Sequence, residues 1–317
     1  MCGARLVGLV KRDRTLRPVA AGDVLRRMAG RLLSRHVAPD ARKFFLARKQ
    51  VGVAVEGGAD AAIAACRDTA RTLPEGHVIV KIDQRNAFNS VQRAAMLDAV
   101  AEDFPAAYPY ARMAYGAHSW LFFGEHRIES RSGVQQGCPM GPLFFSLVMA
   151  RARDAALRTL SEDDRAAITF EAWFLDDGTV AGEQGAVARY VAALEAACAA
   201  VNLVVNRRKC EVIAHEDEDL VDAFSEYRRF TPNDFELLGV PCGDDASVQA
   251  RCEALAANVV RRLRVFSRLP DPQLVYALLR FCGGFPLSNF MARAAGPLGA
   301  EAFRKVDEAT LGVSTPQ

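Results

Sequence analysis

The feature that most constrains this chain is a pair of adjacent carboxylates inside a hairpin signal. Asp176, Asp177 and Gly178 stand between the apolar runs Trp173–Leu175 and Thr179–Val180. Asp-Gly between aromatic and β-branched residues predicts a β-hairpin, because Gly supplies the positive φ that a two-residue primed turn requires. Two neighbouring carboxylates repel each other, which favours capture of a hard divalent cation. Asp-Asp-Gly turns are also common on ordinary surfaces, so the hairpin alone does not identify a metal site.

A third carboxylate follows a strand-like run. Residues His77–Ile82 read as a buried strand, and Asp83 comes directly after it. If this strand pairs beside the hairpin, Asp83 and Asp176 converge on a point that can hold two Mg²⁺ ions about 4 Å apart, the geometry of in-line phosphoryl displacement. A single Asp at a strand end is otherwise a common turn or helix cap.

A loop rich in Gly and Pro lies between these acidic segments. Residues Gly133–Pro142 precede the apolar run Leu143–Ala150. Pro142 suits the first position of a helix, where no amide hydrogen is needed, and the glycines allow the backbone to approach a ligand closely. The pattern predicts a loop that opens a buried helix.

The order of these segments resembles that of reverse transcriptases. An Asp strand is followed by Gln-Gly-x-Pro-x-Gly-Pro before a helix, and then by an aromatic-x-Asp-Asp hairpin. Upstream, Lys11–Ala20 resembles the fingers segment that ends in Arg-Pro. Downstream, Asn202–Glu211 and Glu236–Pro241 resemble the segment after the hairpin and the primer-grip turn. The resemblance covers residues about 5 to 245 and is closest to enzymes of retrotransposons without long terminal repeats.

The resemblance implies an α+β chain with the right-hand polymerase fold. We expect a palm with a small antiparallel sheet flanked by helices, together with fingers and a helical, thumb-like C-terminal part. The expected division is residues 1–76 for part of the fingers, 77–245 for the palm with an inserted fingers segment, and 246–317 for the thumb-like segment.

The resemblance also implies an activity, RNA-directed DNA polymerisation. In such a reaction two Mg²⁺ ions, with Mn²⁺ as a substitute, assist transfer of a nucleotide from a dNTP to a primer 3′-hydroxyl. The partners would be an RNA template, a DNA primer and dNTPs. By the family pattern, Asp83 and Asp176 bridge the ions, Asp177 sits beside them, and the carbonyl of Gln84 completes the nucleotide-bound ion.

The remaining site residues also come from the family pattern. Phe88 stands where the family has an aromatic plate that excludes a 2′-hydroxyl, although a Phe is more often a core residue. Gln136 and Gly137 match the pair that lines the base and sugar. Lys209 matches a residue proposed to assist pyrophosphate departure, and Leu238 with Gly239 falls in the primer-grip turn.

The charge distribution favours a phosphate partner for the N-terminal segment. The net charge is only +2, yet residues 1–50 contain thirteen Lys or Arg against three Asp. Such a basic segment is typical of phosphate binding, although a charge run can equally be a solvated helix face. The resemblance implies that this region contacts the template and the incoming triphosphate, which makes Lys11 and Arg17 the candidates for a phosphate clamp.

Three positions depart from the family pattern. Arg14 stands where the family commonly has Gly in a tight turn, which puts that turn in doubt, and Leu175 stands where many relatives have Ala. Asn202 replaces a Gly at the end of a helix. Because Asn is the next-best residue for a left-handed helix terminus, we expect this exchange to be mild.

Composition indicates a globular protein without a membrane partner. No apolar run approaches the roughly 20 residues that span a bilayer, and Leu6–Val10 is too short for a signal-peptide core. We therefore expect an intracellular protein, and the resemblance to retroelement enzymes makes the nucleus a candidate compartment. Eight cysteines are scattered without a Cys-x-x-Cys pair, which predicts reduced thiols. The sequence identifies no protein partner.

Two other functions remain open from the sequence. One is a catalytically inactive retroelement relic or RNA-binding scaffold with the same fold, against which the intact Asp83, Asp176 and Asp177 argue. The other is an RNA-dependent RNA polymerase, whose palm also pairs an Asp strand with an Asp-Asp hairpin. Phe88 argues against it, since RNA synthesis needs room for the 2′-hydroxyl.

Overall fold

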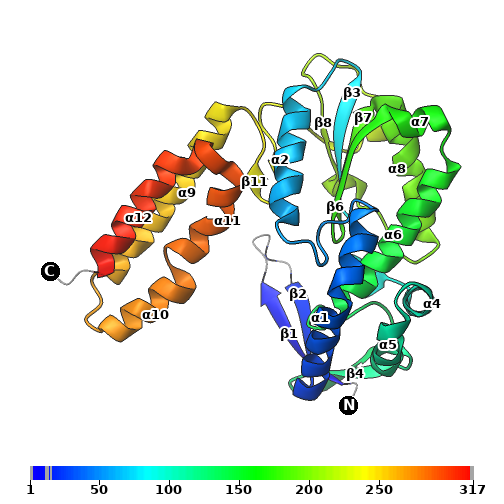
Figure 1. Ribbon diagram of the computed structural model, residues 1–317, viewed down its shortest axis with the longest axis horizontal. Helices are drawn as coiled ribbons and strands as arrows, with labels where there is room; N and C mark the ends of the chain where they lie inside the picture. Colours follow the sequence, from blue (N-terminus) through cyan, green and yellow to red (C-terminus); the bar gives the residue numbers. More distant parts are fainter. Residues whose placement is uncertain (1–2, 11–13, 15, 315–317) are drawn as a thin grey trace. The chain divides into compact units, whose positions relative to one another are not determined.

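The computed structural model describes residues 3–10, 14 and 16–314, and it divides into two compact units (Figure 1). The first unit comprises Met1–Gly58, Gly76–Val212 and Asp219–Arg228. The second comprises Ala59–Glu75, Ile213–Glu218 and Arg229–Gln317. The chain therefore returns to each unit more than once.

The structure contains a five-stranded sheet with the order β6-β7-β3-β8-β9, of which β6, β7 and β3 lie wholly in the first unit. These strands are β3 (His77–Ile82), β6 (Ile168–Phe174), β7 (Asp177–Glu183), β8 (Glu211–Ile213) and β9 (Arg228–Phe230). β7 pairs antiparallel with both β6 and β3. Helix α8 (Gln184–Ala199) packs on β3 and β7, and α6 (Gly141–Thr159) packs against α8. Both helices lie on the same side of the sheet in Figure 1.

Strand β3 lies in the middle of this sheet because its sequence is apolar on both faces. Val78, Ile79, Val80 and Ile82 are all buried. A continuous apolar run of this kind is typical of a strand that is covered on both sides. The pairing of Ile82 with Gly178 then places the end of β3 beside the start of β7.

Helix α6 is the central helix of the first unit. It has Pro142 in its first turn, as the sequence predicts, and its N-terminal half is buried on every face from Leu143 to Ala150. Helix α4 (Arg93–Asp103) packs against it, and the loop before α6 runs beside the sheet end described above. The other helices of this unit are α1 (Val24–Leu46), α3 (Ala87–Ser90), α5 (Tyr108–Tyr115) and α7 (Glu162–Ala167).

A second sheet of the first unit has the order β2-β1-β4-β5. It contains β1 (Ala4–Val10), β2 (Leu16–Gly22), β4 (Ser119–Phe123) and β5 (His126–Ser130). β1 and β2 pair antiparallel from Ala4 with Gly22 to Val10 with Leu16, while β1 and β4 run parallel. α1 begins after Asp23, whose carboxylate accepts a hydrogen bond from the Leu25 N–H at 2.9 Å.

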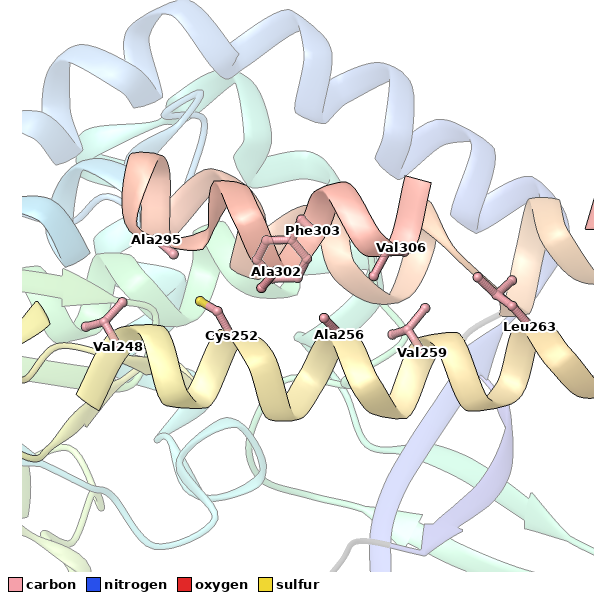
Figure 2. Close-up of a cluster of buried hydrophobic side chains, with 9 residues drawn as sticks. All are labelled: Val248, Cys252, Ala256, Val259, Leu263, Ala295, Ala302, Phe303 and Val306. Atoms are coloured by element: carbon pink, nitrogen blue, oxygen red, sulfur yellow. The ribbon is translucent and has the colours of Figure 1, made fainter. Parts of the chain in front are cut away.

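The second unit is mainly helical. Its elements are α2 (Gly58–Arg71), β10 (Glu236–Leu237), β11 (Val240–Pro241), α9 (Asp245–Phe266), α10 (Pro272–Cys282), α11 (Phe285–Ala295) and α12 (Ala300–Ser314). On α9, an apolar stripe at helical spacing faces α12 and the end of α11 (Figure 2). The buried cluster comprises Val248, Cys252, Ala256, Val259, Leu263, Ala295, Ala302, Phe303 and Val306. The C-terminal segment is thus helical, as expected.

Two further observations bear on the class of protein. The seven cysteines in the described part of the chain are free thiols, as predicted. Among the described helices, none combines the length and the apolarity that are needed to cross a bilayer.

We expect Leu263→Ala to lower the free energy of unfolding by about 2–5 kcal/mol, because it leaves a cavity in the α9 cluster. Leu311→Ala is the matched control, since Leu311 on α12 is 69% exposed, and its cost should stay below about 0.5 kcal/mol. Urea denaturation, with hydrogen exchange at α9 as the probe of unfolding, measures the free energy of unfolding of both variants. Equal costs for the two variants would contradict the assignment of this cluster as the core of the second unit.

Candidate active site

The sequence-predicted carboxylates line one cavity of about 500 Å³ in the first unit. Its walls come from five parts of the chain, namely β2, the segment after β3, the loop before α6, the β6–β7 hairpin and the segment after α8. The lining residues are Arg17, Asp83, Gln84, Arg85, Asn86, Ala87, Phe88, Gln136, Cys138, Pro142, Phe174, Leu175, Asp176, Asp177, Asn206 and Lys209. Residues far apart in sequence are therefore brought to one polar hollow.

The backbone around Asp83 is held from both directions. Its C=O accepts a hydrogen bond from the Asn206 N–H at 2.8 Å, and its N–H donates to Cys210 Sγ at 3.4 Å. Because Ile82 pairs with Gly178, Asp83 follows β3 at the point where Asp177 begins β7. The strand register thus places two of the three carboxylates side by side at one end of the sheet.

The hairpin forms, but its turn differs from the one predicted. The closing pair is Phe174 with Asp177, so the two turn residues are Leu175 and Asp176. Leu175, not Gly178, has the positive φ, +60°. The expectation that Gly178 supplies the turn geometry is therefore wrong.

The reason for Gly178 is packing against Trp173. Any Cβ at Gly178 would lie 2.5 Å from the indole ring, so the strand tolerates only Gly beneath it. The indole N–H donates to Glu171 at 2.8 Å, and Arg153 of α6 forms an ion pair with the same carboxylate. The side of the hairpin away from the turn is thus fixed by a half-buried polar network.

The carboxylates influence one another electrostatically. Asp177 opens to the cavity, but the surrounding protein reduces its hydration, and the pKa of its carboxyl is raised from 3.8 to about 7. Desolvation is the largest cause, the negative charges of Asp176 and Asp83 add to it, and Lys81 and Arg17 oppose it. In such a cavity the ionised carboxylate is unfavourable, and a cation beside it would stabilise the ionised form.

The donor set fits a divalent cation by its chemistry. Three carboxylates line the cavity, and oxygen ligands of this kind suit Mg²⁺ and Mn²⁺. Their side chains do not form a ready cluster, since no group of three or more His, Cys, Asp or Glu in the described residues is arranged to hold an ion.

Phe88 and Gln84 follow Asp83 along the cavity wall. Phe88 is half-buried and stacks on Phe145 of α6, with ring centroids 4.5 Å apart and planes 19° apart. The Gln84 side chain points away from water, with Nε2 donating to Met149 Sδ at 3.1 Å. Its Oε1 is buried and has no hydrogen-bond partner among the residues that the structure describes. Only the backbone of Gln84 is thus suited to the role that the resemblance implies.

The two glutamines of the loop before α6 have different surroundings. Gln136 lines the cavity, whereas Gln135 is buried and accepts a hydrogen bond from Arg26 at 2.9 Å. Gly137 does not line the cavity. It lies against β2, where a Cβ would come 2.3 Å from the carbonyl oxygen of Ala20. Because Gly137 has no side chain, the loop approaches β2 more closely than a residue with a Cβ at this position would allow.

Two predicted phosphate-binding cations meet at the cavity. Arg17 of β2 and Lys209, which follows α8, both line it. Lys11 lies outside the described residues. Leu238 and Gly239 belong to the second unit, where they form the two-residue turn between β10 and β11 with φ values of +52° and +79°.

The departures from the family pattern are accommodated by the backbone. Arg14 has φ +63° and Asn202 has φ +61°, so each adopts the left-handed conformation that Gly would adopt. Sequence reasoning missed Asn206, which holds Asp83, and Gln50, whose side chain contacts the β6–β7 hairpin. A lone Asn or Gln carries no sequence signal for such a role.

We expect Asp177→Asn to stabilise the metal-free protein at high pH. The pKa of this group is about 7 in the folded state, above its ordinary 3.8, so the folded state binds the proton more tightly. The stability of the wild type therefore falls as pH rises through this interval, a loss that a neutral Asn avoids. Thermal unfolding in EDTA should show a larger gain for the variant at about pH 8 than at about pH 5.

The control is Asp98→Asn, an exposed carboxylate on α4. It should give the same melting temperature difference at both pH values. A gain for Asp177→Asn that does not depend on pH would contradict the raised pKa.

Comparison with known proteins identifies the family. Residues 9–242 match the family model for reverse transcriptase (RNA-dependent DNA polymerase). The chain is 31% identical over 215 residues to the retrotransposable element SLACS 132 kDa protein of Trypanosoma brucei gambiense. That alignment covers 66% of this chain but only 17% of the relative, so the chain spans about a sixth of the relative's length.

Solved structures show the same fold. The telomerase of Candida albicans, in complex with a fragment of telomeric RNA, aligns with a TM-score of 0.56 and 10% identity over 98% of this chain and 55% of its own. The apo telomerase of Candida tropicalis aligns with a TM-score of 0.55 and 11% identity over 98% of this chain and 57% of its own. These proteins have the right-hand polymerase fold, which confirms the fold expected from sequence. The match to the family model, which spans residues 9–242, shows that the chain belongs to the reverse transcriptase family.

Proposed function

We propose that the chain catalyses RNA-directed DNA polymerisation for a retroelement. It would transfer nucleotides from dNTPs to a DNA primer 3′-hydroxyl, with an RNA strand as template. The observation that carries the proposal is the single cavity that gathers three carboxylates, a half-buried aromatic ring and two cations. The relatives are a retrotransposon protein and telomerases, one of them solved with RNA, which supports a nucleic-acid partner.

The three carboxylates would hold two divalent cations. Asp83, Asp176 and Asp177, together with the carbonyl of Gln84, would supply the oxygen ligands that hold these ions. When bound, such ions lower the pKa of an attacking hydroxyl and neutralise triphosphate charge. The carboxylates themselves bring negative charge to a point that is fixed by the register of β3 and β7.

The other lining residues would bind and orient the nucleotide. Phe88, supported from behind by Phe145, would lie under the sugar and exclude a 2′-hydroxyl. Gln136 would contact the base and sugar, and Gly137 would let the loop lie close to β2. The second-unit turn at Leu238 and Gly239 would grip the primer. Each role follows from the position of the residue in the family motif.

The cations would bind the triphosphate and the product. Arg17 lines the cavity together with Lys209, and we propose that Lys11 joins Arg17 in a phosphate clamp. Lys209 would stabilise the departing pyrophosphate by its charge. Because long basic side chains bind phosphates mainly through charge, the affinity of these residues for phosphates should fall with added salt. Nuclear localisation stays a prediction.

Primer extension on an RNA template with Mg²⁺ tests the proposal. The purified chain should incorporate dNTPs, and Asp176→Ala should lower the rate by more than about a hundredfold, since several kcal/mol of charge stabilisation are lost. Asp98→Ala on α4, outside the cavity, is the matched control and should keep the wild-type rate.

Two outcomes would overturn the proposal. RNA binding without incorporation of any nucleotide would point to an inactive scaffold. Preferential incorporation of ribonucleotides by the wild type would point to an RNA-dependent RNA polymerase.

Phe88→Ala should relax sugar selection. Removal of the ring opens space beside the 2′ position, so ribonucleotide incorporation relative to dNTPs should rise by about tenfold or more, equivalent to roughly 1.4 kcal/mol. Phe88→Tyr keeps the ring and should retain the wild-type ratio. Competition assays with paired rNTP and dNTP measure it, and an unchanged ratio in Phe88→Ala would exclude Phe88 as the sugar gate.

A further inference from the structure

The turn that carries Asp176 has a backbone conformation that its own sequence disfavours. Leu175 has φ +60°, in the left-handed region. For a residue with a Cβ this costs roughly 1–2 kcal/mol, and such residues persist only where their surroundings hold them. The turn therefore depends on contacts from outside the hairpin.

Those contacts come from a segment far away in the sequence. Residues Lys49–Val51 run beside β6 and form a short parallel pairing with Trp173. The Trp173 N–H donates to the Lys49 C=O at 2.8 Å, and the Val51 N–H donates to the Trp173 C=O at 2.7 Å. This pairing fixes Gln50 next to the turn.

The Gln50 side chain binds both polar groups of the strained residue. Its Oε1 accepts from the Leu175 N–H at 2.9 Å, and its Nε2 donates to the Leu175 C=O at 3.0 Å. Oε1 also accepts from the Gly52 N–H at 2.9 Å. The side chain is 3% exposed, so water does not compete for these bonds. Only a carboxamide can both accept and donate in this way.

Gly52 is part of the same arrangement. Any Cβ at this position would lie 2.8 Å from the Leu175 N and 3.0 Å from Gln50 Oε1. These two atoms are hydrogen-bonded to each other. A larger residue at position 52 would therefore push the turn and the Gln50 carboxamide apart, while leaving the chemistry of Gln50 intact.

We propose that Gln50 is a positioning residue of the active site, which holds the Leu175 turn so that Asp176 stands ready for a divalent cation. The inference rests on the proposed function for its kinetic consequence, but its structural part is independent of turnover. Asp176 is bonded directly to Leu175, so a displaced turn displaces its carboxylate. A displacement of 1 Å at a reacting centre costs about a hundredfold in rate.

Gln50→Met tests this inference, because it keeps the length of the side chain and removes all three hydrogen bonds. Gln184→Met is the matched control. Gln184 makes the same kind of contact on another segment of the first unit, where Nε2 donates to the Asp219 C=O at 3.2 Å and Oε1 accepts from the Val221 N–H at 3.1 Å. Gly52→Ala disturbs the hydrogen bonds between Gln50 and Leu175 without changing either residue.

Three measurements are made on the full chain. Hydrogen exchange at the Leu175 amide should accelerate in Gln50→Met and Gly52→Ala, and Mn²⁺ affinity, measured by electron paramagnetic resonance without nucleotide, should fall. In primer extension, kcat should fall by about tenfold to a hundredfold while KM for dNTP changes little. Gln184→Met should leave all three at wild-type values.

The outcomes separate this inference from the proposed function. Unchanged exchange at Leu175, or faster exchange with unchanged Mn²⁺ affinity, would overturn the positioning role. A wild type that fails to polymerise would defeat the proposed function alone, because exchange and Mn²⁺ affinity would still test Gln50. A matching loss in Gln184→Met would show a general effect of stability and would also overturn the inference.

Discussion

The structure of the site depends on one antiparallel pairing, that of β3 with β7. Ile82 lies opposite Gly178, and this register places Asp83 beside Asp177. Because side chains alternate along a strand, a slip of one residue would reverse the face of every side chain in β3 relative to β7 and would separate Asp83 from Asp177. The register consists of six paired positions, from His77 with Glu183 to Ile82 with Gly178. This pairing thus determines where the acidic groups meet.

The pairing brings the strands together, but the turn needs separate support. Leu175 adopts a costly φ, and Gln50 holds it from a segment that is not part of the hairpin. On the other side, Trp173 lies against Gly178 and is fixed through Glu171 to Arg153. The same arrangement gathers negative charge and raises the pKa of Asp177 to about 7 by desolvation and repulsion. In the metal-free protein, ionisation of Asp177 therefore lowers the free energy of unfolding, a cost that a bound cation would offset.

Much of this could be predicted from sequence where the signal was local. The strand before Asp83, the hairpin and the helix after the Gly/Pro loop all form, and Asn202 takes the left-handed conformation expected of it. The turn residue could not be predicted, because Asp-Gly chemistry favours Gly178 and the cost at Leu175 is offset by a residue 125 positions away. The role of Gln50 could not be predicted either, since one Gln has no periodicity. Which of Gln135 and Gln136 faces the cavity depends on the buried Arg26, a tertiary contact.

We expect Asp83, Asp176 and Asp177 to share divalent cations, although their side chains form no ready cluster in the described residues. A crystal structure with Mn²⁺ and a non-reactive dNTP analogue would locate these ions by anomalous scattering. A metal peak should lie within coordination distance of oxygens from both Asp83 and Asp176. Peaks bound to only one of these carboxylates, or a cavity without metal at saturating Mn²⁺, would contradict it.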